Sequence, residues 1–146
     1  MLYSMNGKQS KVMVFGVFDG LHQGHRWFLR EARKQGDELI VVVASDETVR
    51  LLKKKNPAQS ESERLRALEA IPELSRAVLG DAQMGSYAVL KKYQPDVICL
   101  GYDQDALAED LAMRMKNNEI PRSRLVRIKA HKAHRYHSSL LTKSKK

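Results

Sequence analysis

The chain has 146 residues, of which 42% are hydrophobic, and a formal net charge of +9 at pH 7. This length is typical of one domain that buries its own core, and no apolar run approaches the roughly 18 residues that a membrane-spanning helix needs. The single cysteine excludes an internal disulfide framework and suits a reducing compartment, so we expect a cytoplasmic protein.

The excess of positive charge favours a polyanionic ligand, and a nucleoside triphosphate and a nucleic acid are both of that kind. The basic residues concentrate in three segments, residues 53–55, 122–135 and 143–146. Aromatic residues make up only 6% of the chain and do not alternate with these segments, as a stacking platform for single strands would require. We therefore expect small anionic substrates rather than a nucleic acid.

The first expected strand leads into a turn rich in glycine and histidine. Residues 12–15 are apolar and are followed by Gly16, which is typical of a short buried strand. From Arg26 onward, apolar residues recur at helical spacing. The turn between the two carries His22 and His25. In an open α/β sheet such a turn binds phosphate groups, because backbone N–H groups point out of the helix N-terminus.

The rest of the chain alternates between strands and helices. Further buried strands are expected at residues 38–44, 76–79, 97–100 and 125–128. Helices are expected from Ser45 to Leu52, from a capping box at Ser60 to Pro72, at 85–93, at 103–118 and from near Ser138. This order predicts a Rossmann-like, doubly wound, mostly parallel five-stranded sheet with helices on both faces. We expect a single domain over residues 1–142 and a basic, disordered tail over residues 143–146.

Four clusters of polar residues follow the expected strand ends. They lie at residues 19–25, 45–55, 101–105 and 129–139. In a doubly wound sheet ligands bind beyond the carboxyl ends of the strands. We therefore expect these segments to converge on one active site.

The first turn resembles the signature of a known family. Gly16-Val17-Phe18-Asp19 followed by His22-Gln23-Gly24-His25 is similar to the GTFD and HxGH motifs of the nucleotidyltransferase superfamily, which includes cytidylyltransferases and FAD synthases. Val17 stands where threonine is usual, and Gly20 stands where a larger residue often occurs. Both histidines and the loop glycine are present.

The resemblance extends along nearly the whole chain. Segments similar to a second region of small cytidylyltransferases and archaeal-type FAD synthases are residues 44–50, 53–57 and 63–65. The Leu-Gly-Tyr-Asp-Gln string at 100–104 looks most like the FAD synthase branch. Residues 136–141 resemble a Ser/Thr-rich motif that opens the last helix, although Arg135 is displaced and His137 replaces the usual residue.

This resemblance implies that a phosphate oxygen of an acceptor attacks the α-phosphorus of a nucleoside triphosphate and releases pyrophosphate. The favoured reaction joins ATP and FMN to give FAD, with Mg²⁺ bridging the phosphates. Two alternatives stay open: a cytidylyltransferase that uses CTP and glycerol 3-phosphate or a similar phosphorylated alcohol, and a non-catalytic module that binds nucleotides or nucleic acid. Relatives are often homodimers, and the sequence leaves the oligomeric state open.

The resemblance also implies roles for single residues. The expected catalytic residues, which would donate to the triphosphate or clamp it, are His22, His25, Lys54 and Lys55. The expected nucleotide-binding residues are Gly16, Val17, Phe18, Asp19, Gly24, Gly101, Asp103, Gln104, Ser138 and Ser139. Further candidates are Arg64, Tyr102 and His137. Asp19 would orient the loop or help to position the acceptor or the metal.

Several of these residues also have a purely structural interpretation. The two histidines could serve only the start of the first helix, and Asp103 and Gln104 could cap the helix that follows them. Arg64 could face solvent on its own helix. The sequence does not decide which of the lysines at 53–55 contacts phosphate.

A second histidine cluster has the spacing of a metal site. His131, His134 and His137 recur every three residues, which could place three imidazoles on one helical face. The segment has no cysteine or carboxylate nearby and is strongly cationic, which disfavours a bound cation. We therefore expect a loop that is flexible or faces phosphate, and we assign no metal-ligating side chains.

Overall fold

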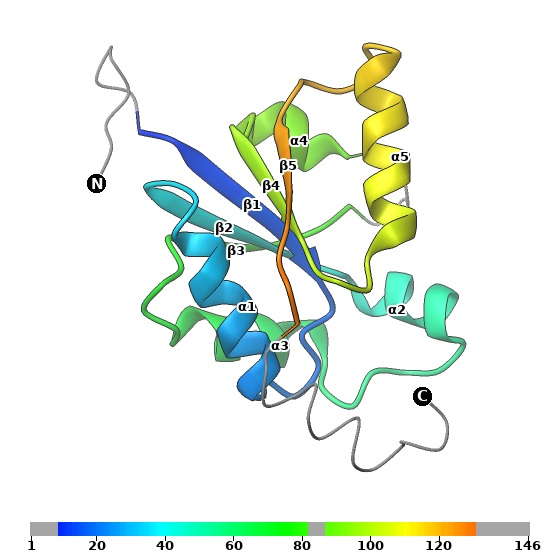
Figure 1. Cartoon of the computed structure of the whole chain (residues 1–146). Helices are drawn as coiled ribbons and strands as arrows, with labels where there is room; N and C mark the ends of the chain where they lie inside the picture. The colour runs from blue at the N-terminus through cyan, green and yellow to red at the C-terminus, as the bar shows by residue number, and fades with distance from the viewer. Residues whose placement is uncertain (1–8, 82–86, 131–146) are drawn as a thin grey trace, which may run out of the picture.

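The computed structural model describes residues 9–81 and 87–130, which form an α/β fold built on one sheet (Figure 1). Five strands run parallel to one another in the order β3-β2-β1-β4-β5. The strands are β1 Lys11–Gly16, β2 Glu38–Val43, β3 Arg76–Leu79, β4 Val97–Leu100 and β5 Arg124–Arg127. The predicted doubly wound, five-stranded sheet is confirmed.

Helices cover both faces of the sheet, as predicted. In the described part of the chain they are α1 Gln23–Arg33, α2 Asp46–Lys53, α3 Glu61–Glu69, α4 Ala88–Tyr93 and α5 Asp105–Lys116. Side chains of α1 and α3 pack into one hydrophobic core, and those of α4 and α5 pack into a second. Figure 1 shows these two pairs on opposite sides of the strands.

The strands supply alternate side chains to the two cores. Val12 and Val14 of β1 join the core under α1 and α3, whereas Met13 joins the core under α4 and α5. The same alternation with a period of two places Cys99 in the first core, next to Ile98 in the second. Burial raises the pKa of the Cys99 thiol to about 12, so this cysteine is a packed apolar side chain rather than a nucleophile.

Serine side chains begin two of the helices, as the sequence predicts. Ser45 Oγ accepts a hydrogen bond from the backbone N–H of Thr48 at 3.1 Å. Ser60 and Glu63 form the expected capping box of α3. α3 ends at Glu69, before Pro72, so the helix is shorter than expected.

Other boundaries also differ by a few residues from those expected. α5 begins at Asp105 rather than 103, because Gln104 has the non-helical backbone of an N-cap residue. α4 begins at Ala88 rather than 85, after Tyr87 with a φ of 51°. β5 runs from 124 to 127 instead of 125 to 128. The helix expected near Ser138 and the tail expected at 143–146 lie outside the described residues.

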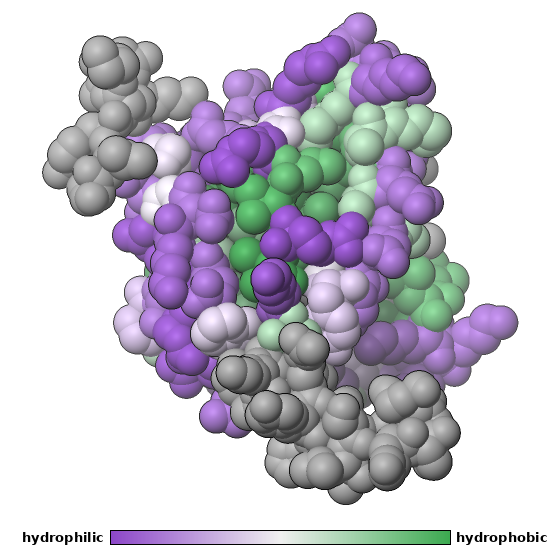
Figure 2. Space-filling model, viewed as in Figure 1, coloured by the Kyte–Doolittle hydropathy of each residue, from purple (hydrophilic) through white to green (hydrophobic). Residues whose placement is uncertain are grey.

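β5 forms one edge of the sheet. It lies on the face of the molecule seen in Figure 2, which shows an apolar area surrounded by hydrophilic residues. Arg124 and Arg127, at the two ends of β5, are exposed. Charged side chains on an edge strand oppose pairing with another chain. Among the described residues, no helix has the length and apolar character needed to cross a bilayer.

The order in which the chain adds strands to the sheet reverses at β1, although all strands run parallel. From β1 the strands proceed outward through β2 to β3, and the chain then returns to the other side of β1 for β4 and β5. The carboxyl ends of β1 and β4 therefore flank the topological switch point, where doubly wound sheets bind ligands.

Truncation of a buried leucine tests the first core. Leu29 of α1 is 0% exposed, whereas Leu51 of α2 is 60% exposed. We expect Leu29→Ala to lower the free energy of unfolding by about 2–5 kcal/mol, because it removes buried apolar surface and leaves a cavity. The matched control Leu51→Ala should change it by less than about 0.5 kcal/mol. Urea unfolding followed by circular dichroism measures both, and equal losses would contradict this packing.

Candidate active site

A cleft of about 970 Å³ lies at the carboxyl ends of the strands. Its wall is built from the segments that follow β1, β2, β3, β4 and β5. His22, Lys53, Asp103 and Lys129, which are far apart in the sequence, all line it. The convergence expected from the sequence is therefore present in the described residues.

Two histidines cap the helix that begins at the cleft. His22 is the N-cap residue of α1, and its Nδ1 accepts hydrogen bonds from the backbone N–H groups of Gly24 at 3.0 Å and His25 at 3.4 Å. In return, Nδ1 of His25 accepts one from the N–H of His22 at 3.3 Å. The pair thus forms a reciprocal capping box. Histidine is not among the residue types preferred for this position, which indicates that the imidazoles serve another purpose as well.

These hydrogen bonds determine which nitrogen of each ring carries the proton. A ring nitrogen that accepts a hydrogen bond has no proton of its own, so the proton of each imidazole is on Nε2. The rings of His22 and His25 are stacked, with centroids 3.8 Å apart, and both line the cleft. The site therefore has two Nε2–H donors at a helix N-terminus, where the helix dipole also favours an anion.

Close packing holds the histidine rings in place. Phe18 is buried and contacts the ring of His25 edge to face, with centroids 5.4 Å apart. Its φ of 54° is costly for a bulky residue. A Cβ at Gly16 would lie 2.7 Å from the Phe18 ring, and a Cβ at Gly24 would lie 3.0 Å from the His22 ring. A Cβ at Gly16 would therefore force the Phe18 ring to shift, and a Cβ at Gly24 would press against the His22 ring, before any phosphate approaches.

Asp19 fastens the connection between α2 and α3 to the histidine loop. Its carboxylate accepts hydrogen bonds from the backbone N–H groups of Ala58 at 2.8 Å and Gln59 at 2.9 Å. Gln59 Oε1 in turn accepts from the N–H of Gly20 at 2.9 Å. The bond from Ala58, assisted by that from Gln59, lowers the pKa of the Asp19 carboxyl. Asp19 therefore orients the loop, which is one of the roles expected for it.

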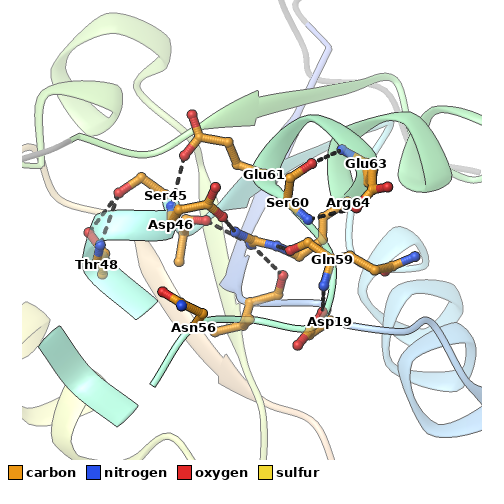
Figure 3. A network of polar contacts seen from close by, with 12 residues as sticks. Asp19, Ser45, Asp46, Thr48, Asn56, Gln59, Ser60, Glu61, Glu63 and Arg64 are labelled. Atoms are coloured by element: carbon orange, nitrogen blue, oxygen red, sulfur yellow. Dashed lines mark hydrogen bonds and ion pairs between the residues drawn. The ribbon is translucent and has the colours of Figure 1, made fainter. Parts of the chain in front are cut away.

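Arg64 joins four segments behind the site (Figure 3). Its guanidinium donates to the carbonyls of Val17 at 3.0 Å, Ala44 at 2.7 Å and Gln59 at 3.1 Å. It also pairs with the Asp46 carboxylate at 2.7 Å. One cation thus joins four segments: the loop after β1, the end of β2, the start of α2 and the loop before α3.

The interpretation that Arg64 faces solvent is wrong. Its side chain is 0% exposed, because the carbonyls and the carboxylate replace its hydration. The sequence contains a signal for this: Arg64 precedes Leu68 by four residues and Ile71 by seven, which places it on the apolar face of α3. Arg64 is not one of the described residues that line the cleft. It therefore supports the site from behind the cleft wall.

The three lysines after β2 occupy different positions. Lys53, the last residue of α2, lines the cleft, whereas Lys54 and Lys55 are exposed and do not. Lys54 ends the helix with a φ of 58°. The roles of Lys54 and Lys55 stay predictions, and Lys53 joins them as a candidate that sequence reasoning did not select.

The predicted string after β4 lies on the cleft wall. Gly101, Tyr102, Asp103 and Gln104 all line the cleft, and Tyr102 and Asp103 are exposed there. Gln104 is the N-cap residue of α5, but no side-chain cap hydrogen bond is formed. The interpretation that the Gln104 side chain caps α5 is therefore not supported.

Aromatic and apolar residues that sequence reasoning missed also line the cleft. They include Phe15, Trp27, Leu52 and Tyr87. The Tyr87 hydroxyl donates a hydrogen bond to Asp110 at 2.7 Å. Burial, with this bond, raises the pKa of Tyr87. These residues lie in β1, in α1, in α2 and at the start of α4. No motif marks them, so the sequence carried no signal that could have identified them.

The remaining predicted residues lie outside the described part of the chain. These are Ser138, Ser139 and the histidines at 131, 134 and 137. The segment that leads to them is attached to α1, because Trp27 Nε1 donates a hydrogen bond to the Lys129 carbonyl at 3.1 Å. Lys129 lines the cleft.

Comparison with known proteins agrees with this architecture. The model of the cytidylyltransferase-like family matches residues 13–143. The chain belongs to the cytidylyltransferase-like family. A protein named FAD synthase from Thermococcus sibiricus is 40% identical over 79% of this chain and 80% of its own length. Another protein of that name, from Archaeoglobus fulgidus, is 44% identical over 77% of this chain and 83% of its own. The predicted resemblance is thus confirmed.

A solved structure has the same fold as this cytidylyltransferase-like chain. It is a lipopolysaccharide core biosynthesis protein from Thermoplasma volcanium, which is 37% identical in sequence with a TM-score of 0.77. The match covers 85% of this chain and 99% of that one.

Two carboxylates on the cleft wall of this cytidylyltransferase-like chain accept hydrogen bonds from backbone N–H groups of the protein itself. Asp19 accepts from two backbone N–H groups, and Asp81 accepts from that of Ala88 at 2.6 Å. Within residues 9–81 and 87–130, no group of three or more His, Cys, Asp or Glu side chains is arranged to hold a metal ion.

Removal of the Arg64 charge tests the junction behind the site. We expect Arg64→Met to lower the free energy of unfolding by about 3–5 kcal/mol, because it leaves the Asp46 carboxylate and three carbonyls without their partner. Arg66 lies on the same helix and is exposed, so Arg66→Met should cost less than about 0.5 kcal/mol. Chemical denaturation measures both variants, and a mild effect of Arg64→Met would contradict the junction.

Asp19→Asn tests the attachment of the loop through its dependence on pH. Because the pKa of Asp19 is lowered in the folded state, its stabilisation is complete above the unfolded value of about 3.9 and is lost as pH falls through the folded pKa. We expect the variant to be less stable than wild type by about 1–2 kcal/mol near neutral pH. This difference should shrink below about pH 4. Thermal unfolding between about pH 3 and pH 7 measures it, and a constant difference would contradict the assignment.

Proposed function

We propose that this chain is an FMN adenylyltransferase, which transfers the AMP group of ATP to FMN and releases pyrophosphate to give FAD. The name FAD synthase, carried by the Thermococcus and Archaeoglobus relatives, supports this activity. The Leu-Gly-Tyr-Asp-Gln string at 100–104 supports it as well. The observation that carries the proposal is the pair of stacked imidazoles that caps α1 at the wall of the cleft.

The reaction joins two anions, so it depends on charge neutralisation and alignment rather than on a covalent nucleophile. A phosphate oxygen of FMN attacks the α-phosphorus of ATP. The bond from that phosphorus to the bridging oxygen breaks, and pyrophosphate leaves with the bond's electrons. His22 and His25 donate from Nε2 to the phosphate oxygens on which negative charge grows, and the N-terminus of α1 adds its dipole.

Cations and hydroxyls complete the phosphate site. Lys53 and Lys129 line the cleft, and we include Lys54 or Lys55 as phosphate clamps. Ser138 and Ser139 are proposed to hold the β- and γ-phosphates. Mg²⁺ would enter bound to the phosphates of ATP, keep several of its waters and neutralise phosphate charge.

The apolar part of the cleft favours FMN over a small phosphorylated alcohol. Phe15, Val42, Leu52 and Val89 line it, and a volume of about 970 Å³ is at the upper end for sites that enclose ligands of this size. An isoalloxazine ring is flat and largely apolar, so it would cover such a wall. Glycerol 3-phosphate has only a three-carbon, hydroxylated chain, which would cover little of this wall.

Pyrophosphate release tests the substrates directly. ATP and CTP are each combined with FMN and with glycerol 3-phosphate in the presence of Mg²⁺, and the flavin products are separated by chromatography. We expect release only with ATP and FMN, with FAD as the product. Release only with CTP would contradict the substrate assignment but not the chemistry, and no release in any mixture would contradict both.

A matched pair of substitutions separates the chemistry of His22 from its role as a cap. Asparagine is a preferred N-cap residue, so His22→Asn keeps the cap and loses the imidazole. We expect this variant to fold with wild-type stability and to lose about 100- to 1,000-fold in kcat, the effect of removing one donor to a growing anion. His22→Ala should lose activity to the same extent and about 1 kcal/mol of stability in addition. Steady-state kinetics of FAD formation and thermal unfolding measure the two effects, and an active His22→Asn enzyme would contradict the mechanism.

A further inference from the structure

The ladder between β1 and β4 is incomplete at the switch point. β1 pairs with β2 through six residue pairs, and β4 pairs with β5 through four. β1 and β4 pair only at Val12↔Val97 and Met13↔Ile98. Toward their carboxyl ends these two central strands therefore part, and backbone groups that would face each other across a ladder need other partners.

The Gln104 side chain bridges the two strands where the ladder stops. Its Nε2 donates a hydrogen bond to the carbonyl of Phe15 in β1 at 2.9 Å. Its Oε1 accepts one from the N–H of Gly101, directly after β4, at 2.8 Å. One amide thus satisfies one backbone acceptor and one backbone donor on opposite sides of the crevice.

Only a side chain with both a donor and an acceptor at this spacing can make the bridge. The amide of glutamine supplies both, whereas a carboxylate only accepts and an apolar side chain does neither. One N–H and the carbonyl oxygen of the amide are used in this way within the protein, and the side chain forms no cap of α5. Gln104 therefore acts on the site through the backbone groups of Phe15 and Gly101.

We propose that Gln104 is a positioning residue that fixes the separation of the two loops that flank the nucleotide site. On one side, Phe15 leads into the loop that carries His22 and His25. On the other side, Gly101 leads into Tyr102 and Asp103. All of these residues line the cleft, so the amide bridge determines the width of the crevice that the nucleotide must fit. The proposal rests on the proposed function in that it takes ATP as the nucleotide.

An isosteric substitution tests the bridge by breaking one half of it. Gln104→Glu keeps the size of the side chain and the acceptor for Gly101, but at about pH 8 it places a carboxylate oxygen against the Phe15 carbonyl. We expect the dissociation constant of MgATP, measured by titration calorimetry without FMN, to rise at least about 10-fold. Gln94 is exposed beyond the amino-terminal end of β4, and Gln94→Glu, with the same change in charge, should bind as wild type does.

Lowering the pH gives a readout that a general loss of stability would not produce. A protonated carboxyl has one O–H donor and one acceptor, as the amide does. The ratio of the MgATP dissociation constants of Gln104→Glu and wild type should therefore fall to within about 3-fold near pH 5.5, since the carboxylate beside a carbonyl takes up a proton readily. Asp103 and Asp105, the charged neighbours in the chain, are present in both proteins, and their negative charges further favour protonation of the introduced carboxyl.

A second variant keeps the test decisive if Gln104→Glu does not fold. Gln104→Met is close in shape and has neither donor nor acceptor of comparable strength, so it should weaken MgATP binding without recovery at low pH. Wild-type affinity at about pH 8 in whichever variant folds would overturn the proposal. Wild-type protein that binds MgATP but forms no FAD would contradict the proposed function and leave the comparison of the variants standing. Wild-type protein that does not bind MgATP would contradict both.

Discussion

The buried guanidinium of Arg64 is the interaction on which the geometry of the site depends. It holds the carbonyl of Val17, in the loop after β1, and that of Ala44, at the end of β2, to the start of α2 through Asp46. A buried charge of this kind is tolerated only when it is fully paired. The loops that follow β1 and β2 can therefore not move apart without leaving a buried cation unsatisfied.

The histidine loop is held together by the same two side chains to which the proposed chemistry assigns the phosphate contacts. The Nδ1 atoms of His22 and His25 accept hydrogen bonds from backbone N–H groups at the start of α1, and the proposed substrate donors are the Nε2–H groups, which these caps do not use. Phe18, in a left-handed conformation, packs against His25 and against Gly16. Strain of this sort is found at functional sites that the surrounding structure holds in place.

The sequence predicts the sheet and the histidine loop well because both leave local signals. Buried parallel strands are continuous apolar runs, and the HxGH motif follows the first of them. The burial of Arg64 was missed because an arginine on an exposed-looking helix is read as solvated, although its spacing from Leu68 places it on the apolar face. The bridge made by Gln104 could not be predicted, since it joins residues 89 positions apart and depends on where β1 and β4 cease to pair. The position of Lys53 depends on where α2 ends, to within one residue.

The most direct test of this account is the location of the imidazole protons. In protein labelled with ¹⁵N-histidine, two-bond ¹H–¹⁵N correlation spectra distinguish a nitrogen that carries a proton from one that does not, and His22→Asn and His25→Asn identify the signals. The account predicts protons on Nε2 of both His22 and His25, and shifts of these Nε2 signals when MgATP is added. A proton on Nδ1 of either ring, or Nε2 signals that do not respond to MgATP, would contradict it.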